Sequence, residues 1–134
     1  MNARPFLDTN IVVYAFSSND ARRQTAEALL EAGGIISVQV LNEFVNVSRC
    51  KQGRDWSEIA GALGVLKVLL DPPQPLTLEL HEAAIDIARQ HGFSIYDSLI
   101  VAAALHADCT VLYSEDIQSS RAIKQLTIRN PFAE

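Results

Sequence analysis

Short apolar segments alternate with helical patterns along nearly the whole chain, and this order constrains the fold more than any other feature. Strands are predicted over residues 4–8, 35–37, 75–77, 110–113 and 126–129. Apolar spacing and helix end signals predict helices over residues 10–17, 20–32, 38–51, 55–70, 78–91, 95–107 and 117–124. This alternation predicts an α/β fold in which helices cover both faces of a mostly parallel sheet.

The composition predicts one domain that spans residues 1–134. Hydrophobic residues make up 49% of the chain, which is enough for a sizeable core. No apolar run approaches the roughly 18 residues of a membrane span, and the start, MNARPFLD, is too short and too soon acidic for a signal peptide. We therefore expect a cytoplasmic protein with no membrane segment. Cys50 and Cys109 stand far apart, without a CxxC motif or an adjacent histidine, and are expected to be reduced thiols.

The formal net charge of −5 argues against a simple nucleic-acid binder, because contacts to phosphate come from lysine and arginine. A bound divalent cation, however, reverses the local charge of an acidic site. The chain also has two small basic clusters, Arg22-Arg23 and the group Arg49, Lys51 and Arg54. The overall charge therefore leaves a metal-dependent role in nucleic-acid chemistry open.

Two acidic residues lie at the ends of predicted strands. Asp8 stands in FLDTN at the end of segment 4–8, and Asp116 stands in LYSED just after segment 110–113. In folds of this class, ligands bind at the carboxyl ends of parallel strands. Both carboxylates are therefore expected at the edge of the sheet where a site would form.

Two further acids lie on predicted helices. Glu43 belongs to a stripe that contains no other charge and is formed with Gln39, Asn42 and Asn46. An exposed helix face usually mixes lysine and glutamate, so this stripe suits the wall of a cleft. Asp97 begins helix 95–107, which is apolar almost all round and must be buried. Its amino end is therefore expected close to the edge of the sheet.

Each acid also has a purely structural interpretation. Asp8 suits a helix N-cap, Glu43 a solvated face, and Asp116 a turn, while Ser94 and Asp97 have the spacing of a capping box. Together, however, the four acids favour a shared cation site. At a separation of about 5 Å each pair would repel by roughly 3 kcal/mol at an effective dielectric constant near 20. A divalent cation would offset that repulsion, and oxygen ligands without Cys or His select Mg²⁺ or Mn²⁺.

The chain resembles the PIN-domain ribonucleases in five stretches. These are Asp8-Thr9-Asn10 after a strand, Glu43 in VLNEF, Asp97 in YDSLIVAAAL, Asp116 in LYSED, and the closing Ile128-Arg129-Asn130-Pro131-Phe132. The resemblance covers nearly the whole chain. A short solitary PIN domain is most similar to the VapC-type toxins of toxin–antitoxin pairs.

The resemblance implies an α/β/α sandwich, Mg²⁺- or Mn²⁺-dependent endoribonuclease activity, a homodimer, and inhibition by a small antitoxin whose tail enters the acidic groove. By match, Asp8 and Asp97 would be direct metal ligands, and Glu43 and Asp116 would complete the catalytic cluster. The match also implies that three polar residues orient carboxylates or water: Thr9, Asn10 and Ser114. The triplet Ser-Glu-Asp is a slight variant of the more usual Thr-x-Asp.

Three other functions, and one uncertain contact, remain open at this point. A metal-independent ribonuclease would use histidines as general acid and base, and the chain has His81, His91 and His106, none of which adjoins an acidic motif. An aspartyl phosphotransferase would use Asp8 as nucleophile, but Asn10 stands where such phosphatases carry a second Asp. A non-catalytic protein would use the acidic groove only to bind a partner. Arg49, Lys51 and Arg54 would hold the RNA backbone or form a solvated helix end.

Overall fold

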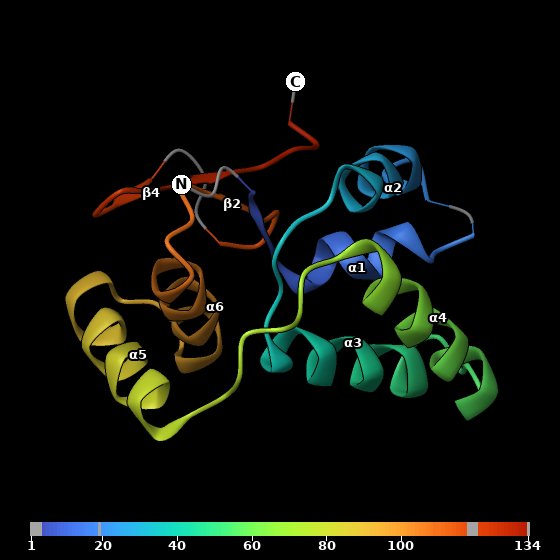
Figure 1. Cartoon of the computed structure of the whole chain (residues 1–134), viewed down its shortest axis with the longest axis horizontal. Coiled ribbons are helices and arrows are strands. Elements are labelled where there is room, and N and C mark those ends of the chain that lie inside the picture. Colours follow the sequence, from blue (N-terminus) through green and yellow to red (C-terminus); the bar gives the residue numbers. More distant parts are fainter. Residues whose placement is uncertain (1–3, 19, 118–120, 134) are drawn as a thin grey trace.

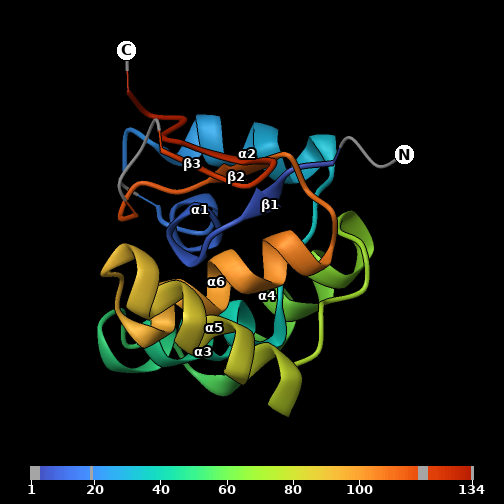
Figure 2. The same ribbon diagram turned by 90° about the vertical axis from the view of Figure 1, so that its left-hand side faces the viewer.

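Four short strands and six helices make up the part of the chain that the computed structural model describes, residues 4–18, 20–117 and 121–133 (Figure 1). The strands are β1 (Phe6–Leu7), β2 (Val111–Tyr113), β3 (Ala122–Ile123) and β4 (Leu126–Arg129). The helices are α1 (Thr9–Ala15), α2 (Arg23–Ala32), α3 (Val38–Cys50), α4 (Trp56–Leu69), α5 (Leu78–His91) and α6 (Ile95–His106). Figure 2 shows α5 and α6 together below the strands, with α2 above them.

The sheet has the order β1-β2-β4-β3, and all of its pairings except β3 with β4 are parallel. The predicted α/β class with a mostly parallel sheet is therefore confirmed. Backbone hydrogen bonds continue past the strand ends, because Asp8 N donates to the Tyr113 carbonyl at 3.0 Å and Ser114 N donates to the Arg129 carbonyl at 2.9 Å. The parallel pairing thus places Asp8 and Ser114 side by side at one edge of the sheet.

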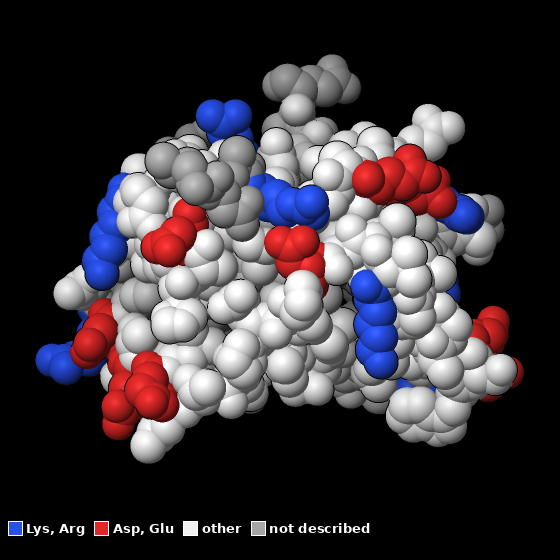
Figure 3. All heavy atoms as spheres, viewed as in Figure 1, with Lys and Arg blue, Asp and Glu red and all other residues white. Residues whose placement is uncertain are grey.

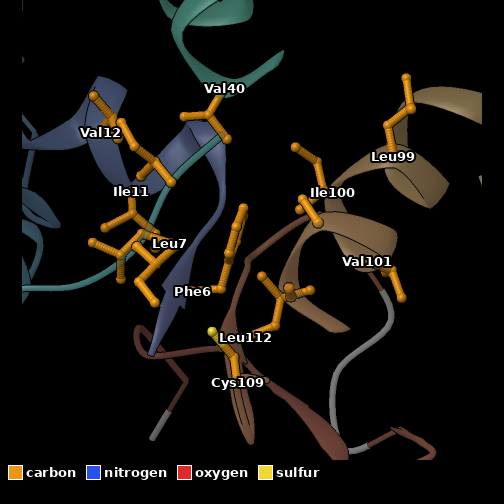
Figure 4. Packing of buried hydrophobic residues seen from close by; sticks show 14 of the residues in the cluster. Phe6, Leu7, Ile11, Val12, Val40, Leu99, Ile100, Val101, Cys109 and Leu112 are labelled. Carbon is orange, nitrogen blue, oxygen red and sulfur yellow. The ribbon is translucent and has the colours of Figure 1, made fainter. Parts of the chain in front are cut away.

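The core lies between the sheet and the helices beneath it. Phe6 and Leu7 on β1 and Leu112 on β2 are fully buried, and Ile100 of α6 points toward them (Figure 4). Seven consecutive residues of α6, Ser98 to Ala104, are buried, as expected for a helix that is apolar all round. This burial holds α6 in the core, and Asp97 lies in the first turn of this helix. None of the described helices is long and apolar enough to cross a membrane.

Three elements differ from the sequence prediction. The helix over residues 117–124 is wrong: β3 pairs antiparallel with β4, and Lys124 in the turn has φ 55°, while residues 118–120 lie outside the described part. Pairing satisfies the edge of β4 and buries Ile123 in the core, which a helix there would not do. Segments 35–37 and 75–77 are not strands, because only single bridges form, Phe6 with Ile35 and Ser37 with Gln74.

Candidate active site

Asp8 is held by two hydrogen bonds from different parts of the chain. It is only 5% exposed, and it is the N-cap residue of α1. Its Oδ1 accepts from Thr9 N at 2.7 Å, while its Oδ2 accepts from the Ser114 hydroxyl at 2.7 Å. The capping interpretation is therefore correct for one oxygen. The second oxygen is bound by a residue 106 positions away, which capping alone does not require.

Ser114→Ala tests the hydrogen bond from the Ser114 hydroxyl to Oδ2 of Asp8. The Ser114 hydroxyl donates to Asp8 and also accepts from Ile117 N at 3.0 Å. Loss of a group that orients a metal ligand typically lowers metal affinity or activity about 10- to 100-fold. We expect a loss of that size in the activity proposed below, measured as the initial rate of RNA cleavage. Ser114→Thr keeps the hydroxyl and should retain most of the activity, and equal losses in both variants would contradict this role.

Glu43 lies on α3 and is joined to the same site through Thr9. Its Oε1 accepts from the Thr9 hydroxyl at 2.5 Å, and its Oε2 accepts from Gln39 Nε2 at 2.9 Å. Gln39 is buried, whereas Asn42 and Asn46 of the same stripe are exposed. The solvated-face interpretation thus applies to the two asparagines, while Gln39 and Glu43 form part of the site wall.

Asp97 begins α6 without closing the capping box that its spacing suggests. The Ser94 hydroxyl accepts from Asp97 N at 3.1 Å, but no return bond joins the Asp97 carboxylate to Ser94 N. In α4, by contrast, Asp55 and Glu58 form both bonds of such a box. The Asp97 carboxylate is therefore not used by its own helix terminus.

The electrostatics connect all four acids. Burial raises the pKa of Asp8 to about 7, and repulsion from Glu43 and Asp97 adds to this, against the stabilising bonds from Ser114 and Thr9. Burial also raises the pKa of Asp97, with repulsion from Asp116 and Glu43. None of the four forms an ion pair with a cationic side chain among the described residues. The site thus gathers negative charge that no cationic side chain in the described part of the chain offsets by an ion pair.

This donor set suits a hard divalent cation. Its carboxylate oxygens are the ligands that Mg²⁺ and Mn²⁺ prefer. Within the described residues, no three Asp, Glu, His or Cys side chains form a ready-made ligand set. Mutual repulsion opposes a tighter arrangement of the carboxylates, so binding a cation would have to draw them together.

The other predicted residues have different surroundings. Asn10 Oδ1 accepts from Glu115 N at 3.4 Å, and its buried Nδ2 has no partner among the described residues. Arg54 donates to the Phe16 carbonyl, and Arg49 donates to the Arg54 carbonyl at 3.0 Å. Arg54 therefore lies at the far end of α1 from Asp8, a helix length of about 10 Å away. The structure does not bring this basic cluster onto the acids.

The histidines have other surroundings. His81 is exposed, and His91 Nδ1 lies 3.1 Å from a guanidinium nitrogen of Arg121. His106 ends α6, nine positions and about 14 Å of helix beyond Asp97 in its first turn. Among the described residues, no histidine forms a hydrogen bond or ion pair with any of the four acids.

A second group of side chains next to Ser114 and Asp116 was not predicted from the sequence. Tyr14 and Arg22 both donate to the carboxylate of Glu115. Arg22 was noted only as part of a basic pair. Its partner lies 93 residues away, and no local pattern in the sequence indicates this pairing.

Comparison with known proteins agrees with the geometry. A model of the PIN domain matches residues 6–124. Among solved structures, Mycobacterium tuberculosis VapC20, a toxin that cleaves the sarcin–ricin loop, has a TM-score of 0.67 at 23% identity, covering 84% of this chain and 90% of that one. VapBC2 from Rickettsia felis, bound to a DNA fragment from its promoter, has a TM-score of 0.65 at 22% identity, covering 93% and 96%.

A toxin–antitoxin complex from Klebsiella pneumoniae is similar as well, with a TM-score of 0.69 at 20% identity, covering 96% of this chain and 98% of that one. At these identities the structures establish a shared fold. No curated protein sequence matches the chain. The family match spans most of the chain, and it agrees with the resemblance found in the sequence. The chain belongs to the PIN domain family.

Proposed function

We propose that this protein is a Mg²⁺- or Mn²⁺-dependent endoribonuclease and the toxin of a toxin–antitoxin pair. The observation that carries the proposal is the buried carboxylate of Asp8. It is repelled by Glu43 and Asp97, and its pKa is raised to about 7, at the sheet edge of a PIN domain. Fold maintenance alone gives no reason to gather such charge, whereas cation binding does.

Asp8 and Asp97 would hold the cation, with Glu43 and Asp116 completing the cluster. A bound cation supplies positive charge that acidifies a water molecule and offsets the charge developing on the phosphoryl oxygens. Thr9 fixes one oxygen of Glu43, and Ser114 fixes one oxygen of Asp8. These bonds would restrict the orientation of two carboxylates toward the cation.

The reaction is hydrolysis of one phosphodiester bond. A water oxygen bonds to phosphorus as the bond from phosphorus to the 3′ oxygen breaks, and that oxygen takes up a proton. The products carry 5′-phosphate and 3′-hydroxyl ends. A histidine ribonuclease would instead leave 2′,3′-cyclic phosphate ends, and no histidine is bonded to one of the four acids among the described residues.

The expected partners are RNA, a small antitoxin protein and a second copy of the chain. Two of the similar structures are described as toxin–antitoxin complexes or bear a VapBC name. Three apolar side chains of α4 are exposed: Trp56 by 61%, Val65 by 45% and Val68 by 84%. Figure 3 shows mostly uncharged atoms around α4, although the helix also carries the exposed Glu58 and Lys67. The exposed apolar side chains support contact with a protein partner.

The test is cleavage of total cellular RNA by the purified chain. With Mg²⁺ or Mn²⁺ we expect discrete fragments whose 5′ ends carry phosphate, mapped by ligation that requires this group. EDTA should stop cleavage, and an excess of Mg²⁺ should restore it. Cleavage that persists in EDTA, or cyclic phosphate ends, would contradict the proposal. Tight partner binding without turnover of any RNA would favour the non-catalytic binding function.

A further inference from the structure

Glu115 stands between Ser114 and Asp116 but takes no part in the acidic cluster. Its carboxylate accepts from the hydroxyl of Tyr14, and both of its oxygens accept from Arg22 Nη1, at 3.1 and 2.9 Å. Its backbone N–H donates to Asn10. A single residue of the turn after β2 is therefore tied to α1 and to the segment that precedes α2.

Arg22 is itself fixed in place. Its Nε and Nη2 bind the two oxygens of Asp20, at 2.8 and 3.0 Å, and its guanidinium lies 4.0 Å from the centre of the Tyr14 ring. The Tyr14 ring also packs edge-on against Phe132, with centroids 5.3 Å apart. Bidentate pairing and stacking both restrict a guanidinium to one orientation. The Arg22 guanidinium, which binds Glu115, is therefore held in one orientation by Asp20 and the Tyr14 ring.

We propose that Tyr14, Arg22 and Glu115 form a latch that positions Ser114 and Asp116 for cation binding. This inference rests on the proposed function and deepens it. Asp116 is exposed, and within the described residues no hydrogen bond or ion pair holds its side chain, so its direction depends on the residues beside it. Through Glu115, the latch holds the backbone directly before Asp116. The residue before Glu115 is Ser114, which donates to Asp8.

The latch also controls charge. An unpaired Glu115 would add a fifth carboxylate next to Asp116 and increase the repulsion that opposes a tight ligand set. Pairing with Arg22 turns the side chain away and offsets its charge. Arg22 therefore acts through Glu115 as a positioning residue and does not touch the reacting atoms.

The test compares Arg22→Ala with Arg23→Ala. Arg23 is the next residue, forms a similar ion pair with Glu27 at 3.1 Å, and is 43% exposed against 40% for Arg22. Two quantities are measured on the full chain: Mn²⁺ affinity by calorimetry, and amide hydrogen exchange of residues 114–117 in EDTA. Tyr14→Phe, which removes one hydroxyl, serves as a milder second variant of the latch.

We expect Arg22→Ala to weaken Mn²⁺ binding about tenfold and to speed exchange of the turn, with smaller changes of the same sign in Tyr14→Phe. Arg23→Ala should leave both quantities at their wild-type values. The exchange measurement needs no metal. A wild-type protein that binds no Mn²⁺ would therefore contradict the proposed function, whereas unchanged exchange in both latch variants would overturn the positioning role itself.

Discussion

Asp8→Asn should reduce RNA cleavage by well over the 10- to 100-fold typical of groups that only orient a metal ligand. An amide has one acceptor oxygen and no charge, so the substitution removes the Asp8 share of the cation site. It also breaks one of the two bonds that Ser114 and Thr9 make to the carboxylate. The measurement is the initial rate on labelled RNA with saturating Mg²⁺, together with circular dichroism to confirm the fold.

Asp86→Asn is the matched control for this substitution. Asp86 lies on the exposed face of α5, so the same change of atoms there should leave the rate within twofold of wild type. Asp97→Asn should behave like Asp8→Asn, because burial and repulsion act on both carboxylates. Substantial cleavage by folded Asp8→Asn protein would refute the assignment of this residue.

The metal-free protein should lose stability as the pH rises from about 4 to about 7. Folded Asp8 keeps its proton up to a pKa of about 7, whereas the unfolded chain releases it near the ordinary value of 3.8. Within this interval the folded state binds more protons, so the free energy of unfolding falls with increasing pH and levels off above about 7. A pKa difference of one unit is worth about 1.4 kcal/mol, which sets an upper limit of about 4 kcal/mol on the part of this loss that Asp8 contributes.

Asp8→Asn should remove most of this dependence. At pH 8 the variant should be more stable than the wild type by up to about 3 kcal/mol, because one lost hydrogen bond, worth about 1 kcal/mol, offsets part of a gain of at most about 4 kcal/mol. At pH 5 the two proteins should differ little. Urea unfolding in EDTA at both pH values measures this, and equal pH dependence in wild type and variant would show that Asp8 titrates normally. Added Mn²⁺ should stabilise the wild type selectively.

The features that were predicted correctly are those with local signals. The apolar character of residues 95–107 is sufficient to predict a buried helix, and short apolar runs before Asp8 and Ser114 predict neighbouring parallel strands. The final helix failed because segment 117–124 has only two isoleucines, Ile117 and Ile123, and both are buried without a helical register. Residues 122–123 form a strand because they pair with the edge of β4. That edge exists only once the sheet has assembled, so no local pattern in this segment indicates it.

The candidate site shows the same division. Capping, stripe and strand-end patterns are enough to select Asp8, Glu43 and Asp97 as candidates, since each pattern is local. The bond between Thr9 and Glu43 spans 34 residues and that between Arg22 and Glu115 spans 93. Such pairs depend on the relative placement of whole elements. The predicted basic cluster follows Glu43 in the sequence and consists of Arg49, Lys51 and Arg54. These residues lie at or beyond the carboxyl end of α3, and Arg54 binds the Phe16 carbonyl at the end of α1 opposite Asp8.

The pairing of β1 with β2 also has a consequence for the order of events on the ribosome. Asp8 is synthesised 106 residues before its partner Ser114. Translation proceeds from the amino terminus, so a growing chain that has not reached Asp97 lacks two of the four carboxylates. Under the proposed function, truncated products that end before residue 114 should therefore not cleave RNA.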